Sequence, residues 1–433
     1  MIHGRSPLDS GSLLDSGSPS IHDADESRQP VIIAALRTPI CRANGQLRHL
    51  RAPDLLAPVI RSLIASVGVD PAGVNDVIMG NAVGGGGNVA RFAALQAGLP
   101  ITVPGLTVDR QCGSGLDAIA LAARLVGAGG DPLYVAGGVE SISTAPSRAN
   151  RNDDGGLDFY SRATFVPPAF GDPDMGVAAE NVASEFRISR NRQDEFALRS
   201  HQRALEAAAT GKFAGEIVPL DGRGAIVDAD DGPKASLRAS LMSRFPAVFV
   251  PDGTVTAANS CFDADAAAAV VITSLKRARE MGAADGLLVL GCETTGVHPE
   301  LLGIGAAHAA ERLLAQHGVT ANDVELIEFN EAFASQTIAC LDHLGIDPAR
   351  ANAEGGALAL GHGYGASGAV LVTRLLAQAR GLSADSGSAP LGLAMISIAG
   401  GMGTAALLRY SRLLGSSGSP SPRAANASPV WRA

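Results

Sequence analysis

The sequence predicts an α/β protein built from two similar halves with an inserted segment between them. Apolar segments of strand length alternate with segments of helical spacing along most of the 433 residues. The same order of segments recurs about 250 residues further along the chain, which indicates an internal repeat. Apolar residues make up 46% of the chain and aromatic residues only 4%, so the core must consist of small side chains that suit closely packed layers.

The first half opens on VIIAAL, a short apolar run typical of a buried strand. Helical spacing and a second apolar run follow, and the pattern continues in the same way. The predicted elements are a strand at 31–36, a helix at 55–67, a strand at 74–82, a glycine-rich turn with a helix after it, a small-residue helix at 116–126 and a strand at 133–138.

The second half repeats this order. Its predicted elements are a strand at 286–292, a helix at 306–317, a strand at 323–332, a helix ending near 344, a glycine-rich turn at 361–368, a helix at 369–379 and a strand at 393–401. The clearest internal match pairs VNDVIMGNA with VELIEFNEA. Repeats of this kind bury a shared core, so we expect the two halves to pack as a pseudo-dimer.

The domain boundaries follow from these segments. An insertion rich in proline and charge, with a helix near 189–208, separates the halves and is expected to cap a site made by both. The two chain ends are rich in Ser, Gly and Pro and are predicted to be disordered tails. The predicted ranges are 1–30 for the first tail, 31–140 with 264–284 for the first half, 141–263 for the cap, 285–410 for the second half and 411–433 for the second tail.

Composition argues against several classes of protein. The net charge of −9 disfavours nucleic acid as a partner. The five cysteines include no CxxC pair, so neither a disulfide framework nor a zinc site is expected, and a reducing, cytoplasmic setting is the simplest interpretation. The first segment lacks the apolar stretch of a signal peptide, and no apolar run of about 18 residues predicts a membrane span.

Chemically distinctive residues fall at the strand ends where α/β folds bind ligands, namely Cys112, Asn330, His362 and Ser397. Cys112 stands in CGSG just before a helix, where the helix dipole favours a thiolate. The glycines let backbone N–H groups approach a carbonyl oxygen closely. This arrangement suits covalent acyl transfer, and the alternative is a structural cysteine in a tight turn.

His362 and Asn330 each allow two interpretations. His362 lies in GHGYGASG, where a neutral imidazole can take a thiol proton or donate to an oxyanion, or can simply be a loop histidine with a structural partner. Asn330 ends an apolar strand, where its amide can hold a water as an oxyanion donor or cap the next helix. A Walker A sequence and a G-x-S-x-G elbow are both absent, so neither a phosphate cradle nor a serine hydrolase is predicted.

Taken together, these segments resemble the thiolase family from about residue 30 to about residue 408. The motifs that carry the resemblance are CGSG at 112–115, GGVES at 137–141, MGVAAENVA at 175–183, NEAFA at 330–334, GASGA at 365–369 and GGMG at 400–403. The resemblance implies a five-layered αβαβα core, a loop domain over the site and a homodimer or homotetramer.

The resemblance also implies a role for each matching residue. Cys112 matches the nucleophile that takes up an acyl group from acyl-CoA, and His362 matches the histidine that activates it and contributes to one oxyanion hole. Asn330 matches the residue that holds the water of that hole, and the N–H groups of Cys112 and Ala399 match a second hole. The matching substrate-lining positions are Met175, Ala332 and Phe333. The implied substrate is a coenzyme A thioester, with no bound cofactor.

Several positions depart from the family pattern. Ser397 stands where thiolases have a second cysteine, the acid/base that moves a proton at the α-carbon of acetyl-CoA, and a hydroxyl is a much poorer base than a thiol. Ala399 replaces a glycine at the second oxyanion hole and restricts φ there. Further differences near the substrate are Gly363, Tyr364, Asp174, Cys261 and Phe262.

Three functions therefore remain open at the level of sequence. The first is Claisen condensation or thiolysis, as in an acetyl-CoA C-acetyltransferase or 3-ketoacyl-CoA thiolase, with water, Ser397 or another group as the base. The second is an acyltransferase that passes the acyl group from Cys112 to an amine or a thiol. The third is a non-catalytic protein that binds acyl-CoA or supports a partner enzyme. All three involve acyl-CoA, and none involves nucleic acid or a membrane.

Overall fold

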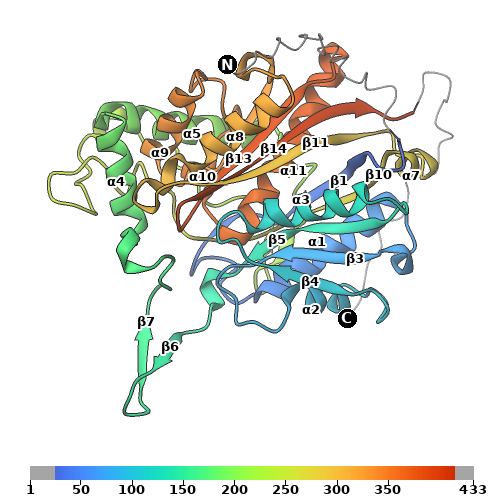
Figure 1. The fold of residues 1–433 in the computed structure, drawn as a ribbon, viewed down its shortest axis with the longest axis horizontal. Coiled ribbons are helices and arrows are strands. Elements are labelled where there is room, and N and C mark those ends of the chain that lie inside the picture. The colour runs from blue at the N-terminus through green and yellow to red at the C-terminus, as the bar shows by residue number, and fades with distance from the viewer. Residues whose placement is uncertain (1–24, 415–433) are drawn as a thin grey trace, which may run out of the picture.

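The computed structural model describes residues 25–414, in which two halves of strands and helices carry an inserted cap (Figure 1). The predicted tails lie largely outside this range, although residues 25–28 form a turn and β14 runs two residues past the predicted boundary. The first half contains β1 (Pro30–Arg37), β2 (Cys41–Arg42), α1 (Ala52–Val67), β3 (Asp76–Gly80), α2 (Val89–Gln96), β4 (Gly105–Val108), α3 (Ser114–Gly127), β5 (Leu133–Glu140), β10 (Ala264–Ser274) and α7 (Leu275–Glu280).

The second half repeats this series, and the cap interrupts the first half between β5 and β10. The second half contains β11 (Asp285–Gly296), α8 (Gly305–Gln316), β12 (Leu326–Phe329), α9 (Ala334–His343), α10 (Ala357–Leu360), α11 (Tyr364–Ser386), β13 (Leu391–Ile398) and β14 (Met402–Arg412). The cap contains β6 (Arg148–Arg151), β7 (Leu157–Tyr160), α4 (Met175–Glu185), α5 (Arg190–Ala209), β8 (Leu220–Asp221), β9 (Ile226–Val227) and α6 (Ala239–Met242). The hairpin of β6 and β7 projects away from the body of the molecule (Figure 1).

The strand order shows the duplication directly. In the first half β3 pairs parallel with β5, and β5–β10 and β10–β1 are antiparallel. In the second half β12 pairs parallel with β13, and β13–β14 and β14–β11 are antiparallel. The strands β3 and β12 of the predicted sequence match thus occupy equivalent places. A short β1–β11 pairing at Val31 and Ile32 joins the two groups of strands into one path.

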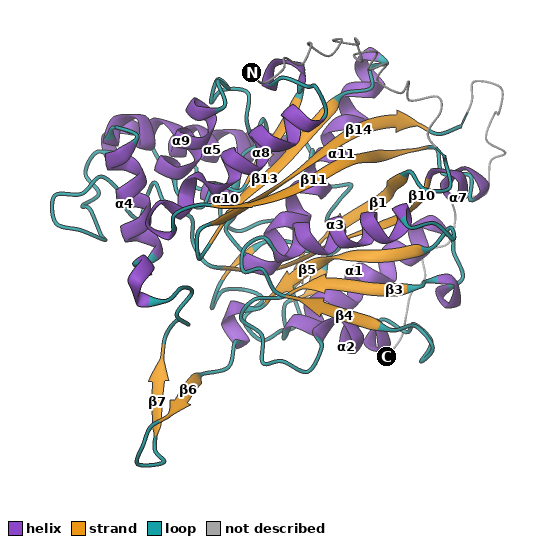
Figure 2. Ribbon diagram, in the orientation of Figure 1, coloured by secondary structure: helices purple, strands orange, loops and turns teal. Residues whose placement is uncertain are grey.

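The helices form the remaining layers of the predicted five-layered arrangement. Helix α11 packs against β5 and β10 of the first half and against β12 and β13 of the second, and α3 lies beside it. Figure 2 shows α3 between the two groups of strands. On the outer faces α1 covers β1, β5 and β10, while α8 covers β11, β13 and β14. One apolar cluster fills the centre and two fill the outer faces, so the large core is divided among these layers.

The two central helices approach each other closely because glycines stand at their contact. A Cβ on Gly115 would lie 2.5 Å from the carbonyl oxygen of Gly365, which is too short for a side chain. Close backbone approach of this kind requires glycine. Of the glycine-rich turn predicted at 361–368, residues 364–368 in fact belong to the start of α11, where the glycines serve helix packing rather than chain reversal.

A buried charge network ties the cap to both halves. Arg37 on β1 donates from Nε to Glu216 at 2.6 Å and from Nη1 to Asp230 at 2.7 Å, and both carboxylates belong to the cap. Arg374 on α11 pairs with the other oxygen of Glu216 and with Glu354. Burial opposes the charge on Arg37, but Asp230 and Glu216 outweigh it and raise its pKa. Glu216 therefore bridges guanidinium groups from the two halves.

The structure adds elements that the sequence patterns did not predict, among them β4, β10, β14 and α4. Strand β10 contains a run of alanines and is buried on both faces, so it shows no alternation of polar and apolar residues. Among residues 25–414, no helix is both long and apolar enough to cross a membrane.

Candidate active site

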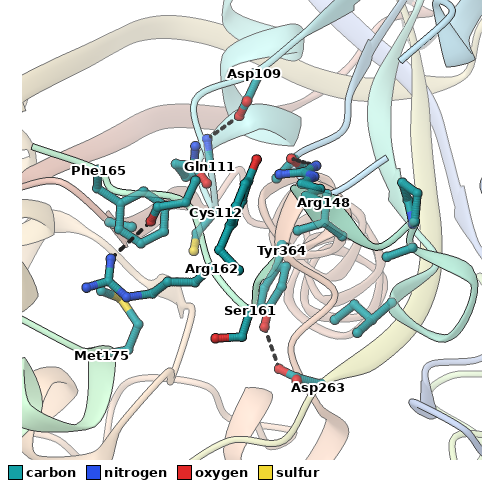
Figure 3. Close-up of a pocket in the computed structure, with 18 of the residues that line it drawn as sticks. Asp109, Gln111, Cys112, Arg148, Ser161, Arg162, Phe165, Met175, Asp263 and Tyr364 are labelled. Atoms are coloured by element: carbon teal, nitrogen blue, oxygen red, sulfur yellow. Dashed lines mark hydrogen bonds between the residues drawn. The ribbon is translucent and has the colours of Figure 1, made fainter. Parts of the chain in front are cut away.

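A cavity of about 860 Å³ lies where the cap meets the two halves (Figure 3). Cys112 and Gln111 line it from the first half, Tyr364 and Ala399 from the second, and Met175 from the cap. Four of the residues predicted from the sequence, Cys112, Met175, Tyr364 and Ala399, thus share one cavity.

The position of Cys112 depends on a strained turn between β4 and α3. Gln111 adopts a positive φ of 48°, which is uncommon for a residue with a side chain. The hydroxyl of Ser114 holds this turn, because it donates to the Gln111 carbonyl at 2.6 Å and accepts from the Arg110 N–H at 2.8 Å. Strain fixed by its surroundings in this way is typical of functional positions.

The surroundings of Cys112 favour the neutral thiol. Burial raises its pKa to about 12, although hydrogen bonds from the N–H groups of Ala399 and of Cys112 itself act in the opposite direction. The nearby amides thus act in the direction expected of the helix entry, but desolvation of the thiol acts against them and is the larger effect. The same two N–H groups are those predicted to form an oxyanion hole, and the structure directs both at the sulfur position.

His362 is suited to take the proton of such a thiol. It is buried, and burial lowers its pKa to about 4, so its ring is neutral near pH 7. Its Nδ1 lies 2.6 Å from the hydroxyl of Ser367, while its Nε2 is buried without a protein partner. If Nδ1 donates to Ser367, Nε2 offers a free lone pair, and the other tautomer offers an N–H to an oxyanion. No hydrogen bond joins the imidazole to Cys112 in the described part of the chain.

Asn330 lies directly after β12, and its Nδ2 is likewise buried without a protein partner. A cavity of about 20 Å³, lined by Asn330, Gly361, Gly363 and Ser367 among others, adjoins this amide. That volume is sufficient for one water molecule, which needs polar partners of this kind. The geometry thus suits the predicted role of Asn330 in holding a water, and that role remains a prediction.

Cys112 and His362 occupy equivalent positions in the two copies. Each stands two residues before the first residue of a central helix, in the sequences CGSG and HGYG. The sequence analysis noted both turns as separate motifs and missed their relation. A search for equivalent x-Gly-x-Gly patterns in the two halves would have found it.

Ser397 lies near a strand end, as predicted, but it does not line the large cavity. It is the second-last residue of β13 and pairs with Gly403 of β14. Its hydroxyl donates to the Gly303 carbonyl at 2.6 Å and accepts from the Ala306 N–H at 3.2 Å and the Gln336 amide at 3.1 Å. One proton and two lone pairs are all that a hydroxyl offers. Ser397 therefore has no lone pair left for a substrate proton.

A Ser397→Ala variant is expected to be less stable by about 2–4 kcal/mol, because it leaves several buried polar groups without their partner. Urea unfolding at fixed protein concentration measures this change. The matched control is Ser184→Ala on the exposed side of α4, expected to change the free energy of unfolding by less than about 0.5 kcal/mol. Equal stability of the two variants would show that the hydroxyl is not structural.

The remaining predicted substrate residues, Cys261, Ala332 and Phe333, do not line the large cavity. They lie together, since the Cys261 N–H donates to the Ala332 carbonyl at 2.9 Å. Phe333 packs edge-on against Phe249 of the cap, with ring centroids 6.0 Å apart. Their contact with substrate stays a prediction.

The sequence analysis missed several residues that line the cavity. Arg148 and Arg162 come from the cap, and Asp263 is the last residue of the cap. Cap residues carry no periodic pattern, so only the charge of the insertion signalled them. Asp174, one of the predicted differences near the substrate, lies outside the cavity lining and pairs with Arg162 at 2.8 Å.

Glu140, at the end of β5, connects the two halves beside the site. Its carboxylate accepts from the Gly365 N–H at 3.0 Å, the Ala82 N–H at 3.0 Å and the Asn81 amide at 2.8 Å. Burial raises its pKa to about 7, and these hydrogen bonds limit the rise. Glu140 thus positions the first turn of α11, which carries Tyr364.

Metal ligands do not gather at this cavity. In the described range, the residues spaced to hold an ion are His308 and Glu311 on α8 and His343 on α9, all at least partly exposed. They do not line the large cavity. The cavity itself offers a thiol, backbone N–H groups and cap side chains, which are the parts of a covalent acyl-transfer site.

Comparison with known proteins agrees with this class of site. The model of the thiolase N-terminal domain matches residues 30–276, and that of the thiolase C-terminal domain matches residues 287–410. The chain is 42% identical over 384 residues to a putative acetyl-CoA C-acetyltransferase VraB from Staphylococcus epidermidis, covering 88% of this chain and 98% of that protein. A VraB from Staphylococcus aureus is 42% identical over 383 residues, with the same coverage.

The fold is also similar to that of a solved structure. The crystal structure of an acetyl-CoA acetyltransferase from Bacillus anthracis has a TM-score of 0.82 and 33% sequence identity, covering 89% of this chain and 99% of that one. A cysteine at a helix entry of a duplicated α/β core suits an acyltransferase, the class to which the names of these relatives belong. Within that class, the chain belongs to the thiolase family.

Proposed function

We propose that the protein is an acetyl-CoA C-acetyltransferase of the thiolase type, which carries an acetyl group on Cys112 and makes or cleaves a carbon–carbon bond. The observation that carries the proposal is the Cys112 thiol in a large cavity with two N–H groups directed at its sulfur. These N–H groups suit the oxyanion of a tetrahedral intermediate. The names of the relatives support carbon–carbon chemistry over transfer to an amine or thiol and over a non-catalytic role.

Mass spectrometry of the protein after incubation with acetyl-CoA tests this proposal. We expect one acetyl group per chain on the Cys112 peptide, together with free CoA and acetoacetyl-CoA in solution. A Cys292→Ser variant is the matched control, because that thiol lies on β11 and does not line the cavity. Acetylation without a carbon–carbon product, discharged by amines, would support the second function instead, and absence of acetylation would support the third.

We also propose that the protein acts as a homodimer or homotetramer. Strand β4 is an edge strand, and apolar side chains are exposed on it and beside it, with Ile101 82% exposed and Phe92 47% exposed. Such an edge requires cover. Sedimentation velocity over a range of concentrations tests this, and a monomer at all concentrations would refute it.

The five free thiols support a reducing, cytoplasmic setting. We propose that neither a bound cofactor nor a nucleic acid or membrane partner takes part.

A further inference from the structure

Carbon–carbon chemistry needs a base for the α-proton of a thioester, and Ser397 is not available for it. All hydrogen-bonding positions of its hydroxyl are taken by Gly303, Ala306 and Gln336. Neutral Cys112 is occupied by the acyl group when the second substrate arrives. The base must therefore be another group that reaches the same cavity, and this inference rests on the proposed function.

Asp263 is such a group. It lines the cavity together with Cys112 and is exposed within it. Its Oδ1 accepts a hydrogen bond from the Tyr364 hydroxyl at 2.6 Å, which Figure 3 shows as a dashed line. In the described part of the chain, no other hydrogen bond or ion pair engages this carboxylate. One oxygen is thus fixed, and the other keeps its lone pairs free.

The carboxylate is also attached to the catalytic loop through its backbone. Asp263 forms a parallel bridge with His362, and the N–H of Ala264 donates to the His362 carbonyl at 3.1 Å. Tyr364 packs edge-on against the His362 ring, with centroids 5.2 Å apart, and adopts a positive φ of 21°. Backbone and phenol together hold the carboxylate in one place, as a base on a carbon acid requires.

We propose that Asp263 is the acid/base of the carbon–carbon step and that Tyr364 is its positioning residue. In condensation, a free carboxylate oxygen takes a proton from the α-carbon of acetyl-CoA. The resulting enolate attacks the acetyl carbon on Cys112, a carbon–carbon bond forms and the carbon–sulfur bond breaks, which leaves a thiolate. The proton held by Asp263 returns to that thiolate, and cleavage runs through the same steps in reverse. Carboxylates serve as bases for protons α to a carbonyl in other enzymes.

Exchange of the methyl protons of acetyl-CoA in D₂O measures the proposed step directly. For Asp263→Asn we expect exchange and acetoacetyl-CoA formation to fall by about 10²–10⁴-fold, the usual contribution of a general base. Acetylation of Cys112 should stay at the wild-type rate. Tyr364→Phe should slow exchange by about tenfold, the effect of one lost hydrogen bond, again with normal acetylation. The matched control is Asp153→Asn at the exposed turn of the β6–β7 hairpin.

The outcomes separate this inference from the proposed function. Wild-type exchange in Asp263→Asn would overturn the inference alone. An equal fall of acetylation and exchange in that variant would overturn it too, because the residue would then be structural. A wild-type protein that acetylates no cysteine would overturn the proposed function and this inference with it. Partial recovery of exchange in Asp263→Glu would support a carboxylate base.

Discussion

A Cys112→Ser enzyme is expected to lose acetylation and carbon–carbon product formation to below about one ten-thousandth of the wild-type rate. In the proposed function the thiol forms the acyl intermediate, and both nearby N–H groups, from Ala399 and Cys112, are directed at its sulfur. A hydroxyl in the same place is far less nucleophilic, and its oxygen does not reach the position of the larger sulfur. Peptide mass spectrometry and the release of CoA measure the loss.

The pH dependence of acetylation follows from the neutral state of the Cys112 thiol and the His362 imidazole. Burial raises the pKa of Cys112 to about 12 and lowers that of His362 to about 4. Between pH 6 and pH 8 the imidazole stays unprotonated, so acetylation should show no loss on the acid side until the pH falls toward about 4. Alkylation of Cys112 by iodoacetamide in the absence of substrate should rise about tenfold per pH unit from pH 7 to pH 9, because the thiolate fraction rises. Fast, pH-independent alkylation near pH 7 would contradict the neutral pair.

A Glu216→Ala variant is expected to lose about 3–5 kcal/mol of stability, the usual cost of removing one member of a buried ion pair. Its carboxylate lies between Arg37 of the first half and Arg374 of the second, and all three side chains are buried. Without it, neither guanidinium keeps its full set of partners, and water cannot replace the lost oxygen. Unfolding in urea at fixed protein concentration measures the change.

An exposed ion pair provides the control for this variant. Arg192 of α5 and Asp342 of α9 lie 2.9 Å apart with both side chains partly exposed. Asp342→Ala is expected to cost at most about 1 kcal/mol. Glu216→Gln keeps the shape of the side chain and one acceptor oxygen. Its loss of stability should therefore fall between those of Glu216→Ala and Asp342→Ala. Equal stability of Glu216→Ala and Asp342→Ala would mean that the buried network contributes no more than a surface pair.

The parts of the fold that could be predicted from the sequence are those with a clear pattern. The apolar run at the start of the first half became β1, and the helical spacing after residue 189 became α5. The alanine run of β10 could not be assigned, since a strand buried on both faces has the same composition as a buried helix. The first turn of α11 was missed because glycines that permit close helix packing resemble glycines of a turn.

The residues of the candidate site likewise divide into those that a sequence motif predicts and those that only the tertiary structure places. Cys112, Tyr364 and Ala399 lie in recognisable motifs, and the cavity brings them together. The direction of the Ser397 side chain depends on the register of β13, which the uniformly buried strand does not reveal. Asp263 closes an irregular cap, and its approach to Tyr364 is a property of the tertiary structure alone.

The cap also breaks a symmetry. The connection from β5 to β10 is the whole cap, residues 141–263, whereas the equivalent connection from β13 to β14 is the short turn at 399–401. Two copies that began with the same framework thus differ in what covers them. Cys112 opens onto the covered chamber, while His362, at the matching position, stays enclosed behind it. The same position in the two copies therefore holds a cysteine that faces the covered cavity in one and a buried histidine outside the cavity lining in the other.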